Sequence, residues 1–481
     1  MYSVVSNKRH QIIILLITAF AILMDGLDQS VVNVALPVIA GEYGVDISSG
    51  SWVVMVYGLF LAGFILAFGK VADNGRIQKI FILGFAIFAL GSLVCALSPN
   101  FIIMVVSRGI QGLGASMIAA TAPLAVTRFL PENQRGFGMG VIATAGGIAF
   151  AFGPAIGGLL TAALSWHWIF LINIPIGIGA IFLAKIFIPK PNKAPEKEPF
   201  DWLGTFLMFG AIASFILTLE RGPAFGWTSP QTLVLGAVFA VLTVLFCIRS
   251  LKAEYPLINI RIFKHWKFTS VSLSYLLTCG LFAGVMYMMP YYLENPLGLD
   301  AGTTGLLLMI SAVITAVIGI PAGSWSDRVG CKLPCILAAL CRIAFSSIMI
   351  FLIPAWGIAG VIPALIFMGL AFGLSGGPST TRIVQFSPKG EEGTGTSVMI
   401  TTDFLGGVIG VAAFSAVFTL AEPASLGISV AELASDIFLN GFHATAVLGL
   451  AFAVATLILT AIVPNYIAKC DTDELKNIKK D

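Results

Sequence analysis

Charged residues are scarce in this chain, and histidines are scarcer still. Only 11% of the 481 residues are Asp, Glu, Lys or Arg, and only 4 are His, whereas a soluble domain is about 25% charged. A soluble fold of this composition has too few polar groups to cover its surface. The net charge of +3 is also too small and too scattered for a nucleic-acid binder. A soluble fold is therefore excluded, and no nucleic-acid partner is expected.

Signatures of bound nucleotide, metal or disulfides are also missing. There is no G-x4-G-K-[ST] motif for a nucleotide phosphate. The 7 cysteines are an odd number, and most lie in apolar runs, so they do not form a disulfide framework. Cys331, Cys335 and Cys341 match no common zinc spacing and have no histidine nearby. We therefore expect no catalytic residues, no enzyme activity, no cofactor and no metal.

Long apolar runs are what the chain has instead. Apolar residues make up 58% of the sequence, and the mean hydropathy is +0.96. A membrane-spanning helix needs about 20 apolar residues, so roughly 280 of them supply about fourteen spans. The runs between charged and turn residues predict spans at 11–36, 50–69, 79–98, 101–125, 137–161, 168–188, 202–220, 231–249, 268–292, 303–325, 334–353, 357–381, 396–420 and 443–467.

The distribution of lysine and arginine predicts the orientation. With the N-terminus in the cytoplasm, 24 of the 27 Lys and Arg residues fall on the cytoplasmic side. Arg221 falls outside, whereas Arg108 and Arg342 lie within spans. The longest external loop is 421–442, which contains no basic residue. We therefore expect a multi-pass protein of the cell membrane with both termini cytoplasmic.

A repeated loop divides the chain into two similar halves. Gly69-x3-Asp73 in the second predicted loop has a counterpart in Gly323-x3-Asp327. The fold class is therefore an all-α polytopic membrane protein with two six-helix bundles and two inserted helices, the plan of a rocking transporter. We expect the units at 1–188, at 189–266 (a linker, the inserted pair and a loop) and at 267–481, which ends in a cytoplasmic tail.

Several motifs occur in the order found in one transporter family. They are LDQSVVNVALP (27–37), RGIQGLG (108–114), GPAIGG (153–158), WHWIFLINIPIG (166–177), DWLG (201–204), Leu219-Glu220-x-Gly222, Gly226-Trp227 and PLINIRIF (256–263). Glu220 lies at the outer end of the seventh span, outside the two six-helix units, and is expected to have a structural or interfacial role. Together the motifs resemble the fourteen-helix drug:proton antiporters of the major facilitator superfamily, over residues 20–460. The resemblance implies the major facilitator fold and proton-coupled multidrug efflux. The chain departs from the family in the shortened loop Asp73-Asn74-Gly75-Arg76, at Ala149 and at His167.

Two acids in the first span are candidates for the proton site. Asp25 and Asp28 are three residues apart, so they share a helix face. A carboxylate at the bilayer centre costs about 2.5–3.5 kcal/mol, and acids kept there are usually functional. Two like charges so close disfavour ionisation of both carboxyls at once. The resemblance assigns the family's acid to Asp28; packing residues held neutral are the alternative.

A buried cation is expected beside these acids. Arg108 lies about seven residues from the outer end of its span, and Asp28 lies about eight from the outer end of the first, so their depths agree. We expect an ion pair between them, with Gln111 one turn along the same face. A salt bridge with a purely structural role is the alternative.

The second half also has charges within its spans. Asp403 and Arg342 lie at similar depths from the inner surface, which permits a pair without requiring one. Asp403 is a candidate substrate or proton group. For Arg342, extension of the side chain to the membrane surface is as good an explanation as function.

Two further sets of residues predict conformational roles. The loop charges Asp73, Arg76, Asp327 and Arg328 are expected to contact helix ends across the interface between the bundles, and so to form a cytoplasmic latch that holds one conformation. The motif Gly153, Pro154, Gly157 and Gly158 combines a missing backbone donor with small residues, so it is expected to bend and thin its helix.

The leading functional hypothesis is a proton-coupled exporter of lipophilic compounds, cations among them. The run 287–292 (YMMPYY) is expected to line an adaptable apolar cavity. The partners of this exporter would be a small-molecule substrate, protons and the lipid bilayer, and a monomer would be the working unit. Export of a lipid, peptide or metabolite, import by symport, a channel and a membrane-embedded lipid-linked transferase are the alternatives.

Overall fold

The computed structural model describes residues 7–73, 75–190, 200–388, 392–422, 428 and 435–465. Within these residues the secondary structure consists of helices. Their bounds are α1 Lys8–Glu42, α2 Ile47–Asp73, α3 Ile77–Ala96, α4 Phe101–Phe129, α5 Glu132–Ala163, α6 His167–Leu171, α7 Asn173–Phe187, α8 Trp202–Phe225, α9 Pro230–Lys252, η1 Ile260–Lys264, α10 Trp266–Glu294, α11 Ala301–Val329, α12 Lys332–Trp356, α13 Ile358–Gln385, α14 Glu392–Ala421 and α15 Ser435–Ile462.

Fourteen helical segments within the described residues are long and apolar enough to cross a membrane. This number confirms the prediction. The short helix α6 and the helix α7 together form the sixth segment, His167–Phe187. The break falls just before Pro175, which has no backbone N–H for a continuous helix.

Several helices are longer than the apolar runs, and polar residues cap the starts of three of them. The side chain of Asn7 accepts hydrogen bonds at the start of α1, and Asp300 and Asn100 do the same for α11 and α4. One predicted boundary is wrong. The external loop was expected to continue to residue 442, but α15 begins at Ser435, because Phe438 and Phe442 pack against aromatic rings of neighbouring helices.

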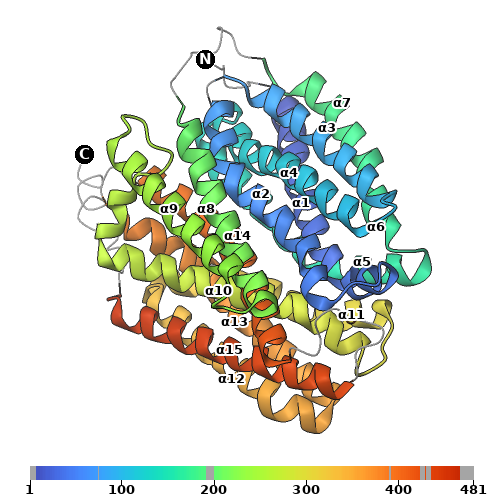
Figure 1. The fold of residues 1–481 in the computed structure, drawn as a ribbon. Coiled ribbons are helices and arrows are strands. Elements are labelled where there is room, and N and C mark those ends of the chain that lie inside the picture. Colours follow the sequence, from blue (N-terminus) through green and yellow to red (C-terminus); the bar gives the residue numbers. More distant parts are fainter. Residues whose placement is uncertain are drawn as a thin grey trace.

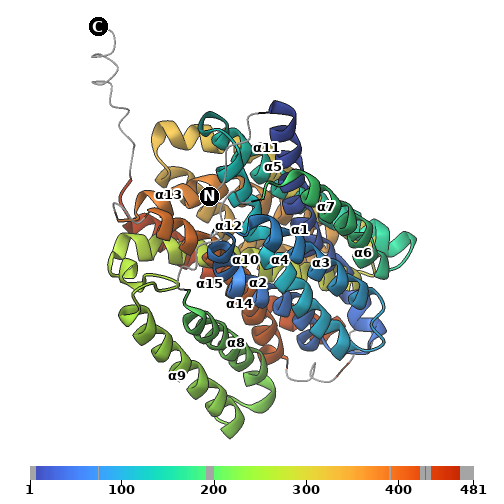
Figure 2. The same ribbon diagram turned by 90° about the horizontal axis from the view of Figure 1, so that it is seen from above.

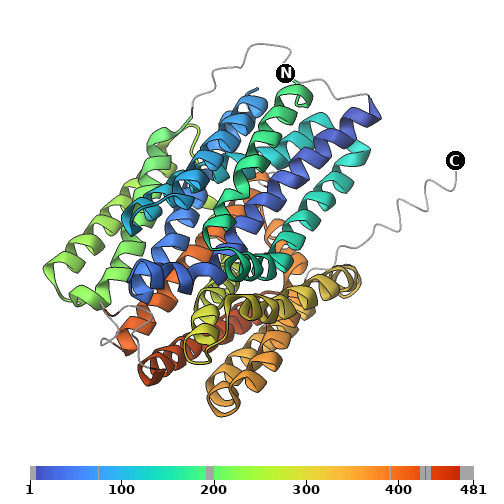
Figure 3. The ribbon, with the colours of Figure 1, turned by 90° about the vertical axis from the view of Figure 1, so that its right-hand side faces the viewer.

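The helices form two groups that lie against each other (Figures 1 and 3). In the first group, α1 packs on α5, α2 and α3 pack on α4, and α7 packs on α3. In the second, α10 packs on α14 and α15, and α11 and α12 pack on α13. We refer to α1–α7 as the N-bundle and to α10–α15 as the C-bundle.

The inserted pair α8 and α9 lies at the edge of the molecule, next to both bundles (Figure 2). Helix α8 packs against α2 of the N-bundle and α14 of the C-bundle, whereas α9 packs mainly on α8. Only 6% of the apolar window of α9 is buried inside the protein. Helix α9 therefore presents most of its surface to lipid, and α8 is the helix that touches the transport bundles.

The two bundles are in contact on one side of the membrane. We call the side where α1 begins the N-terminal side and the side where it ends the distal side. Distal contacts join α5 to α11, and the hydroxyl of Tyr287 in α10 donates to the carbonyl of Ile47 at the start of α2. The distal side is therefore closed between the bundles. Figure 3 shows the opposite ends of the bundles diverging.

The aromatic and methionine run in α10 belongs to this closed contact. Tyr287, Met288, Met289, Tyr291 and Tyr292 are each no more than 2% exposed and pack in the main hydrophobic core. The expectation that this run lines a cavity is therefore wrong. Contact between the bundles buries it, which the local sequence does not reveal.

Candidate functional site

The carboxylate of Asp28 is the centre of a buried polar network in the N-bundle. Its Oδ2 accepts a hydrogen bond from Nη1 of Arg108 at 2.6 Å. Its Oδ1 accepts from Nε2 of Gln111 at 2.7 Å and from Nδ2 of Asn173 at 2.9 Å. The network thus joins helices α1, α4 and α7 and places the expected pair Asp28–Arg108 in direct contact.

Arg108 is held on all sides by the N-bundle and is only 1% exposed. Its Nε donates to the carbonyl of Val53 at 3.0 Å, and its Nη1 also donates to Oε1 of Gln111 at 2.7 Å. The guanidinium carbon lies 4.3 Å from the ring centroid of Tyr57, in the range of a cation–π interaction. The cation is therefore preorganised, and only Asp28 supplies it with a compensating charge among the described residues.

Asp25 is close to this network but has a different partner. The hydroxyl of Tyr57 donates to Oδ1 of Asp25 at 2.5 Å. Tyr57 thus contacts Asp25 through its hydroxyl and Arg108 through its ring. The two acids share a helix face, as their spacing predicts, but the structure gives the cation to Asp28 and a neutral donor to Asp25.

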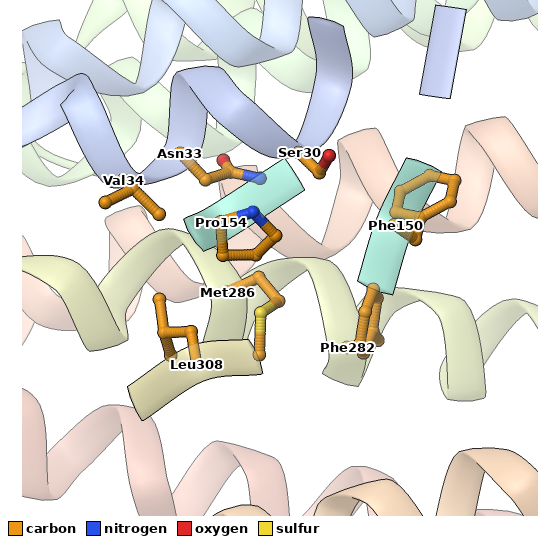
Figure 4. A pocket seen from close by; sticks show the side chains of 8 residues that line it. All are labelled: Ser30, Asn33, Val34, Phe150, Pro154, Phe282, Met286 and Leu308. Atoms are coloured by element: carbon orange, nitrogen blue, oxygen red, sulfur yellow. The ribbon is translucent and has the colours of Figure 1, made fainter. Parts of the chain in front are cut away.

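A small pocket lies between the bundles, and α1, the helix that carries Asp28, forms one of its walls (Figure 4). It is lined by Ser30, Asn33 and Val34 of α1, Phe150 and Pro154 of α5, Phe282 and Met286 of α10, and Leu308 of α11. Most of the lining is apolar. Oδ1 of Asn33 is buried and has no hydrogen-bond partner within the described residues, so it is available to a donor group on a ligand.

The glycines of the fifth-helix motif allow backbones to approach closely. A Cβ atom at Gly153 would lie 1.7 Å from Oγ of Ser30, and one at Gly157 would lie 2.7 Å from the carbonyl oxygen of Val31. A Cβ at Gly158 would lie 2.1 Å from the carbonyl oxygen of Ala301. The first two positions therefore fit α5 against α1 within the N-bundle. Gly158 fits α5 against α11 of the C-bundle on the distal side.

The charged residues in the spans of the C-bundle do not form a pair. Asp403 is exposed, and Sγ of Cys279 donates to its Oδ1 at 3.1 Å. Arg342 is 2% exposed, donates to Oγ of Ser375 and lies over the ring of Phe372. Because Arg342 is buried by its neighbours, it does not extend to the membrane surface. Asp403 remains accessible, unlike Asp28.

The loop charges differ from the predicted latch. Asp73 accepts two hydrogen bonds from Arg128, at 2.9 Å and 2.6 Å, and both residues belong to the N-bundle. The reason is electrostatic: Asp73 ends α2, where a negative charge is unfavourable, and Arg128 lies in the last turn of α4. Arg76 and Arg328 are exposed, and the side chain of Asp327 lies outside the described part of the structure.

Sequence reasoning missed two members of the network. Asn173 lies within the motif 166–177, and a polar amide two residues before a proline inside a span was the available signal. Tyr57 gave no local signal, because an aromatic residue in an apolar run is ordinary. Its role depends on α2 lying beside both α1 and α4.

The comparison with protein families identifies the superfamily. A family model described as Major Facilitator Superfamily matches residues 18–411. The chain belongs to this superfamily. It is therefore a membrane transporter of small molecules and not an enzyme, as the sequence predicts.

Curated relatives of this major facilitator protein cover most of its length. The riboflavin transporter RibZ of Clostridioides difficile (strain 630) is 31% identical over 84% of this chain and 88% of its own. The multidrug resistance protein Stp of Mycobacterium tuberculosis (strain H37Rv) is 29% identical over 85% of this chain and 76% of its own. The multidrug transporter MdtP of Bacillus subtilis (strain 168) is 30% identical over 84% and 75%. These relatives confirm the resemblance to the drug antiporter family.

Solved structures show the same fold. The crystal structure of a bacterial homolog of the human lysosomal transporter Spinster matches with a TM-score of 0.66 and 15% identity, over 95% of this chain and 98% of that chain. A transporter of the POT family in complex with a thioalcohol-conjugated peptide matches with a TM-score of 0.67 and 13% identity, over 94% and 96%. The major facilitator fold expected from the motifs is therefore confirmed.

Proposed function

We propose that this protein is a proton-coupled antiporter that exports lipophilic compounds, cations among them. One observation carries the proposal: helix α1 places the buried Asp28–Arg108 pair and the wall of the interbundle pocket within two turns of each other. Asp28 faces the interior of the N-bundle, whereas Ser30 and Asn33 line the pocket. A change at the carboxylate therefore reaches the pocket through one rigid element.

In this mechanism, Asp28 exchanges its contact with Arg108 for a proton during each cycle. With the ion pair formed, the carboxylate of Asp28 accepts hydrogen bonds from three donors, on Arg108, Gln111 and Asn173. Because both residues of the pair belong to the N-bundle, the exchange requires α1 to shift against α4 within that bundle as the two bundles rock. A buried carboxylate parted from its cation favours the protonated form. Asp25, one turn away on α1, disfavours a second negative charge and tunes the same step.

The surroundings of the pocket support a lipophilic substrate. Six of the eight lining residues are apolar, among them two phenylalanines and Met286, and a flexible methionine side chain adapts to different ligand shapes. Asn33 offers a hydrogen-bond acceptor. The exposed carboxyl of Asp403, on α14 across the interface from the N-bundle, offers a charge for a cationic substrate.

The proposal includes an orientation and a division into units. The N-terminal side is cytoplasmic, in keeping with the concentration of 24 of 27 Lys and Arg residues there. The units are 1–188, 189–266 and 267–481, as the sequence predicts. Cysteines placed at residues 195 and 430, both outside the described part of the chain, test the orientation. An impermeant thiol reagent applied to intact cells should label only residue 430. Labelling at residue 195 would show that the orientation is the reverse of the one proposed.

The transport assay uses the purified protein in liposomes with a pH-sensitive dye inside. Ethidium, a lipophilic cation, should move against an imposed proton gradient and dissipate it, and Asp28→Asn should abolish both fluxes. Asp25→Asn should be milder and change the substrate range more than the coupling. If Asp28→Asn still exchanges protons for substrate, Asp28 is not the coupling residue and Asp403 becomes the next candidate.

Export of a polar metabolite is the second candidate function, because RibZ, a relative at 31% identity, is named a riboflavin transporter. The same liposomes distinguish the two. Proton exchange driven by riboflavin and not by ethidium would assign a metabolite substrate. The reverse result would assign drug export.

A further inference from the structure

The inserted helix α8 carries a buried acid that the transport mechanism does not use. Glu220 lies near the distal end of α8 and is only 1% exposed. Helix α8 lies against α2 on one side and α14 on the other, with α9 outside it (Figure 2). Glu220 is therefore placed where the N-bundle, the C-bundle and the inserted pair meet.

One oxygen of Glu220 connects all three parts. Oε1 accepts hydrogen bonds from the hydroxyls of Ser48 at 2.6 Å and Ser51 at 3.1 Å, both on α2. It also accepts from the hydroxyl of Ser415 on α14 at 3.1 Å. When the bundles part on the distal side, α2 and α14 must separate, so Glu220 cannot keep both sets of contacts.

The second carboxyl oxygen of Glu220 is free to carry a proton. Oε2 of Glu220 is buried and has no hydrogen-bond partner within the described residues. Across the described ranges, no cation lies within ion-pair distance of this carboxyl. The charged and titratable groups that interact electrostatically with this site are Arg221 on the same helix and Tyr287 on α10, and Tyr287 in turn interacts with Asp46.

These surroundings favour a neutral carboxyl while the distal side is closed. An ionised carboxylate buried without a paired cation is strongly disfavoured. Hydroxyl donors on one oxygen alone do not replace the water that the other oxygen loses. Separation of α2 from α14 would let water reach the carboxyl and allow it to ionise.

We propose that Glu220 is a proton-binding gate residue: it takes up a proton as the distal side closes and releases the proton to the same side as that side opens. This site is separate from Asp28, because its proton enters and leaves on one side and is not transported. The inference rests on the proposed function only for the point in the transport cycle at which Glu220 binds its proton. In that cycle, acid outside the cell favours closing of the distal side. It also gives the inserted pair a role in transport.

The test measures closure of the distal side without substrate or a proton gradient. Spin labels are attached to cysteines at Leu97, which is 68% exposed at the end of α3, and at Trp356, 64% exposed at the end of α12. Both positions lie on the distal side, one in each bundle. The protein is full length, with its 7 native cysteines changed to serine in a variant that keeps transport. Double electron–electron resonance spectroscopy gives the populations of short and long distances between the two spin labels as the pH is varied.

The expected result is a pH-dependent distance distribution. The ratio of open to closed molecules should rise with pH, by up to about tenfold per pH unit for one released proton. Glu220→Gln, a neutral isostere, should stay closed at all pH values. Ser415→Ala should open the distal side more at each pH but keep the pH response.

Matched variants separate this inference from the proposed coupling mechanism. Glu42→Gln makes the same change at a distal carboxylate whose hydrogen bond from Nε1 of Trp166 stays within the N-bundle, and it should behave as wild type. Asp28→Asn should also keep the pH response, even though it abolishes coupled transport. A normal pH response in Glu220→Gln overturns the inference. So does a response that disappears only in Asp28→Asn.

Discussion

Replacing Asp28 by asparagine would leave the guanidinium of Arg108 buried without a compensating charge. The pair is among the least exposed in the protein, with 1% of the Arg108 side chain and 0% of the Asp28 side chain accessible. Breaking a buried ion pair by removing one partner costs about 3–5 kcal/mol. An asparagine oxygen can still accept one hydrogen bond, and the ring of Tyr57 and the carbonyl of Val53 still face the cation. We therefore expect a loss near the lower end, about 3 kcal/mol in the free energy of unfolding.

A second substitution tests whether the unpaired cation is the cause. Arg108→Gln in the Asp28→Asn background removes the buried charge, so the double variant should recover most of the lost stability. It should not recover proton-driven transport, because neither the acid nor its partner remains. Thermal unfolding in detergent measures the first quantity, and the liposome assay measures the second.

The matched control is the ion pair Asp201–Arg249, at 2.9 Å, in which the arginine side chain is 43% exposed. Asp201→Asn should cost less than Asp28→Asn, because water can solvate the freed guanidinium. Equal stability losses in the two variants would contradict the reasoning from burial. Wild-type stability of Asp28→Asn, or transport regained in the double variant, would refute the proposed role of the pair.

Other substitutions test separate parts of the structure. Gly158→Val should prevent distal closure and transport while leaving the protein folded, because its side chain would meet the α11 backbone; unchanged spin-label distances would contradict this. Asp73→Asn should change the free energy of unfolding by about 1 kcal/mol or less, since its pair with Arg128 is exposed; a larger loss would indicate a structural role. Asp327→Asn should slow transport but keep substrate binding, and equal loss of both would argue against a latch. Asn173→Ala should weaken proton coupling without unfolding the protein, as measured by proton flux in liposomes.

Membrane-spanning segments and the fold class were predictable from the sequence because their causes are local. Each span must satisfy the hydrogen-bonding groups of its own backbone within lipid, so an apolar run that is long enough defines a helix. The fourteen segments follow from this requirement. The common depth of Asp28 and Arg108 was likewise predictable, because depth depends only on distance along each helix.

Contacts between helices were decided by the tertiary structure alone. The sequence shows that Asp73 carries a charge, but only the positions of α2 and α4 pair it with Arg128. The same holds for Tyr57, which meets both Asp25 and Arg108 because α2 lies beside α1 and α4. For Glu220 the sequence provides only an acid near the end of an apolar run, and the structure buries it where three parts of the chain meet, which makes it a candidate gate. The physical reason is that lipid dictates the length and polarity of each helix, whereas the rotation of each helix and its neighbours depend on close packing with residues far away in the chain.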